Sequence, residues 1–314
     1  MKGNDFMKFC EKESHFKRDA LPRTDLACES INVSRHTRGT TYREYTVRGL
    51  PICELRVLDH EGEAATGRPV GSYMTIHCPI IRTLDPVTED NICSALCNVI
   101  ISYAERLTKK PVSEETKVLI AGLGNRFISA DSIGPRTADK IAVTAHMLAS
   151  DKRELFLKIG CARLCAVHPG VMGQTGIEAS AMIKGAAEYA KPDLVIVVDA
   201  LAARSTERLC ATIQLSDTGI EPGSGIGNRR GAVNRETIGY PVMAIGVPTV
   251  VDCATLVYDA MSRAGLGDGG HELYGSLKKE RDLFVSLRDC DIVSEEISGL
   301  LARAINRAFL CEGL

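Results

Sequence analysis

The chain has 314 residues, of which 45% are hydrophobic and 25% charged, and its formal net charge is -2. These values are ordinary for a globular protein, and without a basic excess the sequence argues against a nucleic-acid binder. Residues 1–20 are charged and mixed, which predicts no signal peptide, and no stretch reaches the roughly 18 apolar residues of a membrane span. We therefore expect a cytoplasmic protein that contacts neither a membrane nor nucleic acid directly.

The N-terminal part of the sequence is polar at first and then rich in predicted strands. Residues 1–25 are expected to form a flexible leader. Alternating and β-branched residues, with Gly and Pro between them, predict strands at Tyr42–Leu50, Ile52–Leu58 and Tyr73–His77. A helix is expected next, capped by Thr88 or Asp90, and it runs to about Leu107.

From Lys117 onward, short apolar strands alternate with helices. The expected strands lie at 118–121, 165–167, 194–198, 211–214 and 243–247, and helices are expected at 138–148, at 177–190 and from Ser294 to the C-terminal region. Continuous apolar strands of this kind are typical of a parallel sheet that is covered on both faces. The predicted fold class is therefore α/β, with a mostly parallel sheet, helices on both faces and an added N-terminal β-rich portion.

The twelve cysteines are expected to be buried and reduced. Cys93 and Cys97 are four residues apart, as are Cys161 and Cys165, and this spacing on a helix offers two ligands to a metal. No CxxC pair or Cys/His quartet completes a zinc site, however. We expect neither a metal nor a cofactor.

Two acidic residues follow predicted strands. Asp131 lies in the loop after the first core strand, and Asp199 ends the apolar run LVIVVD. Ligands bind at the carboxyl ends of strands in open α/β sheets, so these two side chains are candidates for one site. An ionised carboxylate can activate water while a protonated one donates to a scissile carbonyl group. A helix cap or a turn is the alternative role for an aspartate at such a position.

Other catalytic and binding motifs match less well. The dinucleotide fingerprint needs a third glycine where Phe127 stands, and the glycine-rich loop at 223–230 lacks the Gly-Lys-Ser/Thr of a P-loop. Backbone amides of that loop remain candidates for holding an oxyanion. The sequence has no GxSxG elbow and no HExxH motif. His168 is a single loop histidine, for which an incidental role is the main alternative to a ligand or base.

Seven strings of the sequence resemble those of one protein family, in the same order along the chain. They are RTDLA at 23–27, GLGN at 122–125, ADSIGP at 130–135, PGVMGQTGIE at 169–178, DALAARS at 199–205, TIQLSDTGIEPGSGIGNRR at 212–230 and AIGVPTVVD at 244–252. The last helix, at 292–310, is also similar. The chain thus resembles the germination proteases, the spore endopeptidases, from about residue 23 to about residue 256.

The resemblance implies an activity, a substrate and an assembly. Germination proteases degrade the small acid-soluble proteins that coat DNA in dormant spores. They are made as inactive precursors, lose a short N-terminal peptide by self-cleavage and assemble as tetramers. Their fold is similar to that of the hydrogenase maturation proteases. We therefore expect a homotetrameric endopeptidase of the spore core, made as a zymogen and active without a cofactor.

The resemblance also implies site residues. The family's activity is attributed to two aspartates, which fall by motif on Asp131 and Asp199. The implied cleavage site lies between Asp25 and Leu26, because RTDLA resembles substrates in which Glu is followed by Ile or Phe and then Ala. Cleavage there would separate a propeptide, residues 1–25, from a single peptidase domain, residues 26–314.

Departures from the family pattern leave some questions open. His168 stands where the family has Ala, GNRFISAD differs before the aspartate, and the segment 264–291 looks shortened, with an open effect on the tetramer. Two other functions remain as alternatives. One is a metal-sensing endopeptidase of the hydrogenase-processing type, against which the RTDLA leader argues. The other is a non-enzymatic nucleotide-binding module, against which the missing third glycine argues.

Overall fold

The computed structural model describes residues 24–30, 37–78, 85–149, 153–223, 231–265 and 283–310. Residues 1–23, with nearly all of the expected propeptide, lie outside these ranges. So do the glycine-rich loop from 224 onward and most of the segment that looks shortened. Among the helices of the described residues, none is both long enough and apolar enough to cross a bilayer.

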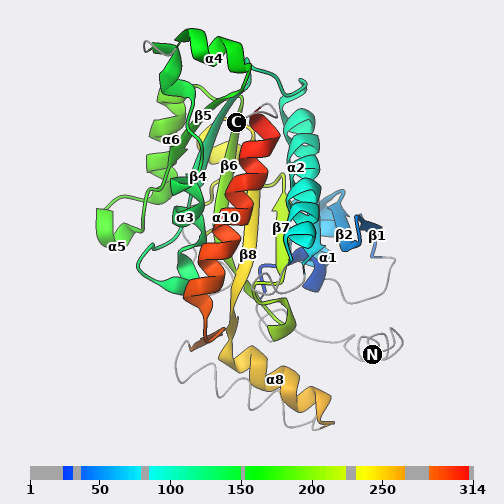
Figure 1. The fold of residues 1–314 in the computed structure, drawn as a ribbon. Helices are drawn as coiled ribbons and strands as arrows, with labels where there is room; N and C mark the ends of the chain where they lie inside the picture. The colour runs from blue at the N-terminus through cyan, green and yellow to red at the C-terminus, as the bar shows by residue number, and fades with distance from the viewer. Residues whose placement is uncertain are drawn as a thin grey trace.

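Every strand of the described residues joins one sheet (Figure 1). The order is β1-β2-β3-β7-β8-β6-β4-β5, with β9 paired to β8. The strands are β1 Thr40–Val47, β2 Leu50–Val57, β3 Gly71–His77, β4 Lys117–Gly122, β5 Arg163–Val167, β6 Leu194–Ala203, β7 Thr212–Ser216, β8 Val242–Asp252 and β9 Phe284–Ser286.

The sheet has a parallel half and an antiparallel half. Strands β5, β4, β6 and β8 are parallel neighbours, as their continuous apolar sequences predicted. Strand β7 pairs antiparallel with β8 and with β3, so the N-terminal strands β1 to β3 extend the same sheet. The α/β fold class and the added β-rich portion are therefore confirmed.

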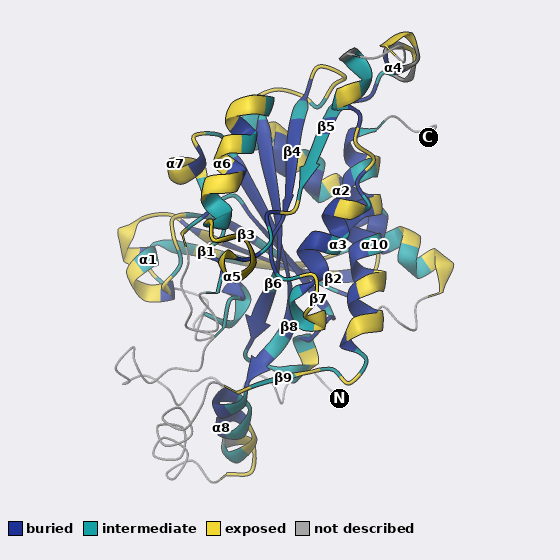
Figure 2. Ribbon diagram, turned by 90° about the vertical axis from the view of Figure 1, so that its left-hand side faces the viewer, coloured by how far each residue is buried: buried dark blue, intermediate teal, exposed yellow. Residues whose placement is uncertain are grey.

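Helices cover both faces of the sheet (Figure 2). On one face, α2 (Pro86–Thr108), α3 (Ile133–Asp139) and α10 (Cys290–Phe309) pack over residues such as Ile196 and Ile245. On the other face, α6 (Ala179–Ala190) and α7 (Arg235–Ile238) pack over Val195 and Val197. The remaining helices are α1 His60–Thr66, α4 Arg153–Ile159, α5 Met172–Thr175 and α8 Cys253–Arg263, with 3₁₀ turns η3 Ala27–Glu29, η5 Ser129–Asp131, η6 Ala145–Ala149 and η7 Thr206–Arg208.

The start of α2 differs from its prediction. Asp85, not Thr88 or Asp90, is the N-cap, and its carboxylate accepts hydrogen bonds from the N–H groups of Val87 and Thr88, both at 3.0 Å. Pro86 then occupies the first helical position, where its fixed φ suits a helix and its missing N–H is not needed. The predicted body of the helix, to about Leu107, is confirmed.

Two of the later predicted helices also have other boundaries. The helix expected at 138–148 is divided into α3 and η6, because Thr144 leaves the helical path to bond the backbone of Ala162 and Leu164 beside β5. The last helix begins at Cys290, so Ser294 is not its cap. Ser294 is fully buried, and its hydroxyl group bonds the loop that carries Asp131.

Candidate active site

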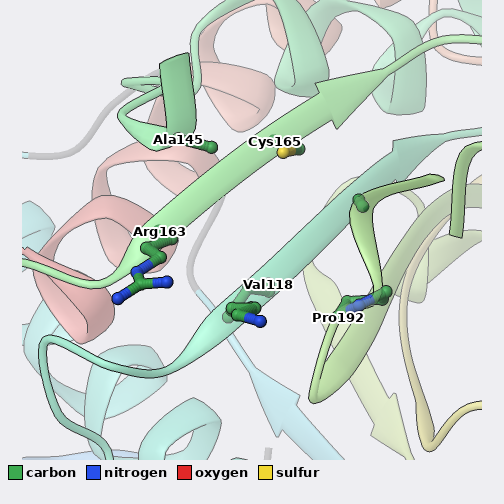
Figure 3. Close-up of a pocket in the computed structure, with 7 residues that line it drawn as sticks. Val118, Ala145, Arg163, Cys165 and Pro192 are labelled. Atoms are coloured by element: carbon green, nitrogen blue, oxygen red, sulfur yellow. The ribbon is translucent and has the colours of Figure 1, made fainter. Parts of the chain in front are cut away.

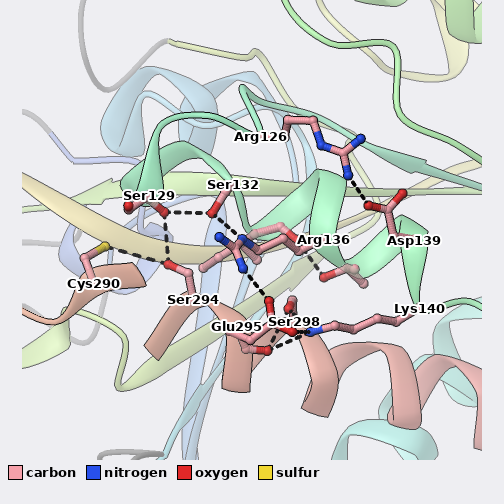
Figure 4. Close-up of polar contacts among 12 residues, drawn as sticks. Arg126, Ser129, Ser132, Arg136, Asp139, Lys140, Cys290, Ser294, Glu295 and Ser298 are labelled. Carbon is pink, nitrogen blue, oxygen red and sulfur yellow. Dashed lines mark hydrogen bonds and ion pairs between the residues drawn. The ribbon is translucent and has the colours of Figure 1, made fainter. Parts of the chain in front are cut away.

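The loop that carries Asp131 is held by side chains from two distant elements, and Figure 4 shows one of them, Ser294 of α10, bonded to Ser129. The carbonyl oxygen of Ser129 accepts a hydrogen bond from Ser294 Oγ of α10 at 3.0 Å, and that of Ala130 accepts one from Thr249 Oγ1 of β8 at 2.6 Å. The Asp131 carboxylate accepts from the N–H of Asn125 at 2.8 Å. Three consecutive residues are therefore fixed, which positions the Asp131 carboxylate before any substrate binds.

Thr249 reaches this loop because of an irregularity in β8. The pairing between β6 and β8 shifts register after Leu201, so that Pro248 and Val250, but not Thr249, have partners on β6. A bulge of this kind redirects the side chain of the extra residue. Here the redirected hydroxyl group is completely buried and bonds Ala130.

The glycines of the GLGN string serve close packing around Asp131. Gly124 has φ +111°, and a Cβ atom there would overlap the carbonyl oxygen of Asp131. A Cβ atom on Gly122 would overlap the backbone of Gly134, and one on Gly134 would overlap the carbonyl oxygens of Leu123 and Val198. Because each glycine allows two backbone segments to touch, their presence needs no bound nucleotide to explain it.

Asp199 lies in β6, next to the strand that leads into the Asp131 loop. Its side chain is buried, at 5% exposure, and its Oδ1 accepts from the N–H of Ala200 at 2.9 Å. Strand β6 does not end there as the sequence suggested, but continues to Ala203 along β8. Strands β4 and β6 are parallel neighbours, and the N–H of Leu123 bonds the carbonyl oxygen of Val198 at 2.8 Å. Both aspartates therefore lie toward the carboxyl edge of the sheet.

The segment at Asp25 and Leu26 is docked against the end of β6. The N–H of Asp25 donates to the carbonyl oxygen of Ala202 at 2.8 Å, and the N–H of Ala202 donates to the Asp25 carboxylate at 2.9 Å. Leu26 has no exposed surface and packs in an apolar cluster with Leu201 and Leu209. The predicted cleavage site thus contacts the same strand that carries Asp199.

Two buried side chains anchor this segment beyond Leu26. Gln214 of β7 contacts the backbone of Asp25 and Ala27. The Glu29 carboxylate, 6% exposed, pairs with Arg208 Nε at 3.0 Å and accepts hydrogen bonds from the N–H groups of Arg204 and Ser205. The sequence did not single out Gln214, Glu29 or Arg208, because only the fold joins them. Gln214 lies in the string at 212–230, which resembles the germination proteases, and this resemblance is the one feature of the sequence that could have pointed to it.

A separate cavity lies at the opposite end of the parallel strands (Figure 3). It has a volume of about 160 Å³ and is lined by Lys117, Val118, Ala145, Arg163, Cys165, Ala190 and Pro192. Lys117 and Arg163 are the first residues of β4 and β5, so the cavity is at the amino edge of the sheet. Its lining has no carboxylate, and neither candidate aspartate contributes to it.

Other candidate groups contribute little to the aspartate site. His168 Nε2 is 3.4 Å from an oxygen of Asp139, on the surface. Within the ranges that the structure describes, no three His, Cys, Asp or Glu side chains are placed to hold a metal ion. The absence of a metal stays a prediction.

The described cysteines are all free thiols, and two pairs of them are in contact. The hydrogen bond from Cys28 lowers the pKa of Cys53 and raises that of Cys28, and Cys53 also contacts His77. The Cys210–Cys290 contact acts in the same way and lowers the pKa of Cys290. Cys53 is only 4% exposed and lies on β2, apart from the strands that carry the aspartates.

Comparison with known proteins identifies the family. Residues 23–287 match the family model of the germination proteases. A germination protease from Caldanaerobacter subterraneus is 42% identical over 76% of this chain and 72% of its own length. One from Clostridium perfringens is 37% identical over 91% of this chain and 94% of its own.

Among solved structures, the [NiFe] hydrogenase maturation protease HycI from Thermococcus kodakarensis covers 61% of this chain and 93% of its own, with 16% identity and a TM-score of 0.33. That score is too low to carry an argument about fold. The sequence matches, in contrast, span most of the chain at high identity. The chain belongs to the germination protease family and is a protease.

Proposed function

We propose that this chain is an endopeptidase of spore germination that begins the breakdown of small acid-soluble DNA-coating proteins. It is made as a zymogen that cuts its own chain between Asp25 and Leu26, which removes residues 1–25 and leaves one peptidase domain, 26–314. The observation that carries the proposal is the docking of this bond against β6, the strand of Asp199.

Asp131 and Asp199 are the proposed catalytic pair. One carboxylate takes a proton from water, and the other, protonated, donates to the carbonyl group of the bond that is cut. The fixed loop around Asp131 and the burial of Asp199 support this role, because each restricts the movement of one carboxylate. Neither a metal nor another cofactor takes part.

The contacts of residues 25–27 support self-cleavage at this bond. The N–H of Asp25 bonds the backbone of β6, and Leu26 has an extended backbone before the 3₁₀ turn η3 begins at Ala27. An extended chain bonded to a strand is a common mode of peptide recognition. Leu26 is buried in an apolar cluster, so a large apolar residue after the cut bond is favoured. Substrates bind at the same position beside β6 after this segment has left it.

The proposal includes assembly and location. The enzyme acts as a homotetramer in the spore core, and it contacts neither nucleic acid nor a membrane directly. Large apolar side chains such as Tyr189, Phe127 and Val87 are exposed by 92%, 81% and 71% and are available for contacts between subunits or with substrate.

The test uses the full-length chain and a purified small acid-soluble spore protein. We expect mass spectrometry to show fragments cut after an acidic residue, and N-terminal sequencing of the enzyme to begin at Leu26. Asp131→Asn and Asp199→Asn should each lower both rates by at least about 10²-fold, because each removes half of the acid–base pair. Near-normal cleavage by either variant, with an unchanged circular dichroism spectrum, would refute its catalytic role.

A further inference from the structure

Gln214 contacts the chain on both sides of Leu26. Its side-chain Nε2 donates to the carbonyl oxygen of Asp25 at 3.1 Å, and its Oε1 accepts from the N–H of Ala27 at 2.7 Å. Gln214 is only 8% exposed, so the two contacts form in a site from which water is largely excluded. The Asp25 carbonyl group belongs to the Asp25–Leu26 bond itself.

The sheet places Gln214 in one row with Asp199. Gln214 of β7 pairs with Gly246 of β8, and Gly246 pairs with Asp199 of β6. Paired residues on neighbouring strands project to the same face of a sheet, so the two side chains lie on one face. Gly246, between them, has no side chain, and Leu201 fills the space above it. Leu201 belongs to the apolar cluster that holds Leu26.

From this geometry we propose that Gln214 is a further catalytic residue, which holds the carbonyl oxygen of the cleaved bond while that oxygen becomes negative. This inference rests on the proposed function, and it adds a third group to the two aspartates. Preformed donors aimed at a developing oxyanion are strong catalytic elements where water is excluded. The N–H of Ala27 donates to Oε1 of Gln214 and so keeps the Nε2 group of Gln214 directed at the carbonyl oxygen of Asp25.

The reaction proceeds without any oxidation or reduction. The oxygen of a water molecule bonds to the carbonyl carbon of Asp25, and the electron pair of the C=O double bond moves to the oxygen held by Gln214. The proton lost by water passes to the aspartate pair. The C–N bond to Leu26 then breaks, and its nitrogen takes up that proton, which leaves a carboxyl group on Asp25 and an amino group on Leu26.

The decisive variant is Gln214→Glu in the full-length chain, because it keeps the size of the side chain and the acceptor for Ala27 but loses the donor. We expect self-processing at neutral pH to slow by about 10²–10³-fold, the usual cost of removing one such donor. As pH falls and the new carboxyl group becomes protonated, it can donate again, so the rate should recover. Gln214→Leu has no donor at any pH and should stay slow throughout.

Hydrogen exchange at the Ala27 amide separates catalysis from anchoring. We expect this amide to remain as protected in Gln214→Glu as in the wild type, while processing is slow. Loss of that protection would show that Gln214 only anchors the segment. Processing within about threefold of the wild-type rate would also overturn the proposal. A wild-type chain with no product beginning at Leu26, or normal processing by Asp199→Asn, would instead count against the proposed function.

Discussion

The Asp131 loop and the segment at 24–30 are held by different combinations of contacts. In the loop, distant side chains bond the main-chain oxygens of Ser129 and Ala130, and the carboxylate of Asp131 accepts a hydrogen bond from the N–H of Asn125. In the segment, Ala202 and Gln214 bond the backbone of Asp25 and Ala27. The segment's own side chains add to this attachment, because Leu26 lies in an apolar cluster and Glu29 forms an ion pair.

The difference separates permanent parts of the site from replaceable ones. A loop fixed through its backbone keeps its position, whichever chain lies beside β6 in the place of residues 25–27. The segment combines backbone contacts, which any peptide can make, with contacts of its own side chains, so another chain with similar side chains at the same spacing can replace it. We therefore expect changes at the loop to lower turnover and changes at the segment to alter docking.

The largest effect in this comparison is expected from Gly124→Ala. The new Cβ atom overlaps the backbone of Asp131, and φ +111° is strained for any residue with a side chain. Displacing a catalytic group by about 1 Å can cost 10²-fold in rate, so activity on a protein substrate should fall by about that factor. Gly185→Ala is the matched control, because nothing lies within 4 Å of its new Cβ atom. Equal activity of the two variants would contradict the fixed-loop interpretation.

The next effect is expected from Arg208→Met, which leaves the buried Glu29 carboxylate without its cation. The backbone N–H groups of Arg204 and Ser205 remain, so we expect docking to weaken by about 1–3 kcal/mol and self-processing to slow by about tenfold. N-terminal sequencing over time measures the rate. Arg106→Met removes a partly buried ion pair to Asp217 and should leave the rate unchanged. Similar slowing in both variants would point to general destabilisation.

A smaller effect is expected from Ser294→Ala, which removes one hydrogen bond to Ser129. The free energy of unfolding should fall by about 1 kcal/mol, and turnover by a few fold, because the bond to Ala130 still holds the loop. Ser298→Ala, on the same helix, removes a hydrogen bond from Lys140. It should lower the free energy of unfolding by a similar amount without lowering turnover. Denaturant unfolding and kinetic assays together distinguish the two variants.

The smallest effect concerns Glu295, whose carboxylate bonds Lys140 and Arg136 (Figure 4). These contacts lower the pKa of Glu295 below its ordinary value of 4.5. A lowered pKa stabilises the fold at pH above the ordinary value, and the stabilisation is lost as pH falls through the pKa of the folded state. Because the side chain is half exposed, Glu295→Gln should lower the free energy of unfolding by less than about 1 kcal/mol at pH 7. In strong acid, where Glu295 is protonated, the substitution should not change the free energy of unfolding. A stability difference that did not shrink in acid would contradict this account.

The sequence predicted the parallel core and singled out Asp199 for one physical reason, whereas Asp131 was a candidate because it lies in the loop after the first core strand. Buried strands need continuous apolar residues, so an acidic residue directly after such a run is conspicuous, as at Asp199. It did not predict how far β6 continues, because Ala200–Ala203 are apolar, three of the four are alanine, and such a run fits a strand or a helix equally well. The role of Thr249 could not be predicted either, since it depends on a shift in the pairing between β6 and β8.

The partners of the docked segment could not be predicted for a different reason. Glu29 and Arg208 are ordinary charged residues in the sequence, and such residues are usually solvated. Only the fold removes them from water together and makes their pairing necessary. Gln214 was expected merely as the last residue of a strand, and its contacts appear once residues 25–27 lie beside it.

The attachment of the docked segment to its own enzyme has a kinetic consequence. A tethered segment meets the site at an effective concentration that linker geometry sets, typically in the millimolar range, and dilution does not change it. Self-processing should therefore follow first-order kinetics, with a half-life independent of protein concentration. In the proposed zymogen, a free substrate must compete with that local concentration until the segment leaves. We therefore expect the uncut chain to act on other proteins only after a delay, whose length the rate of self-processing sets.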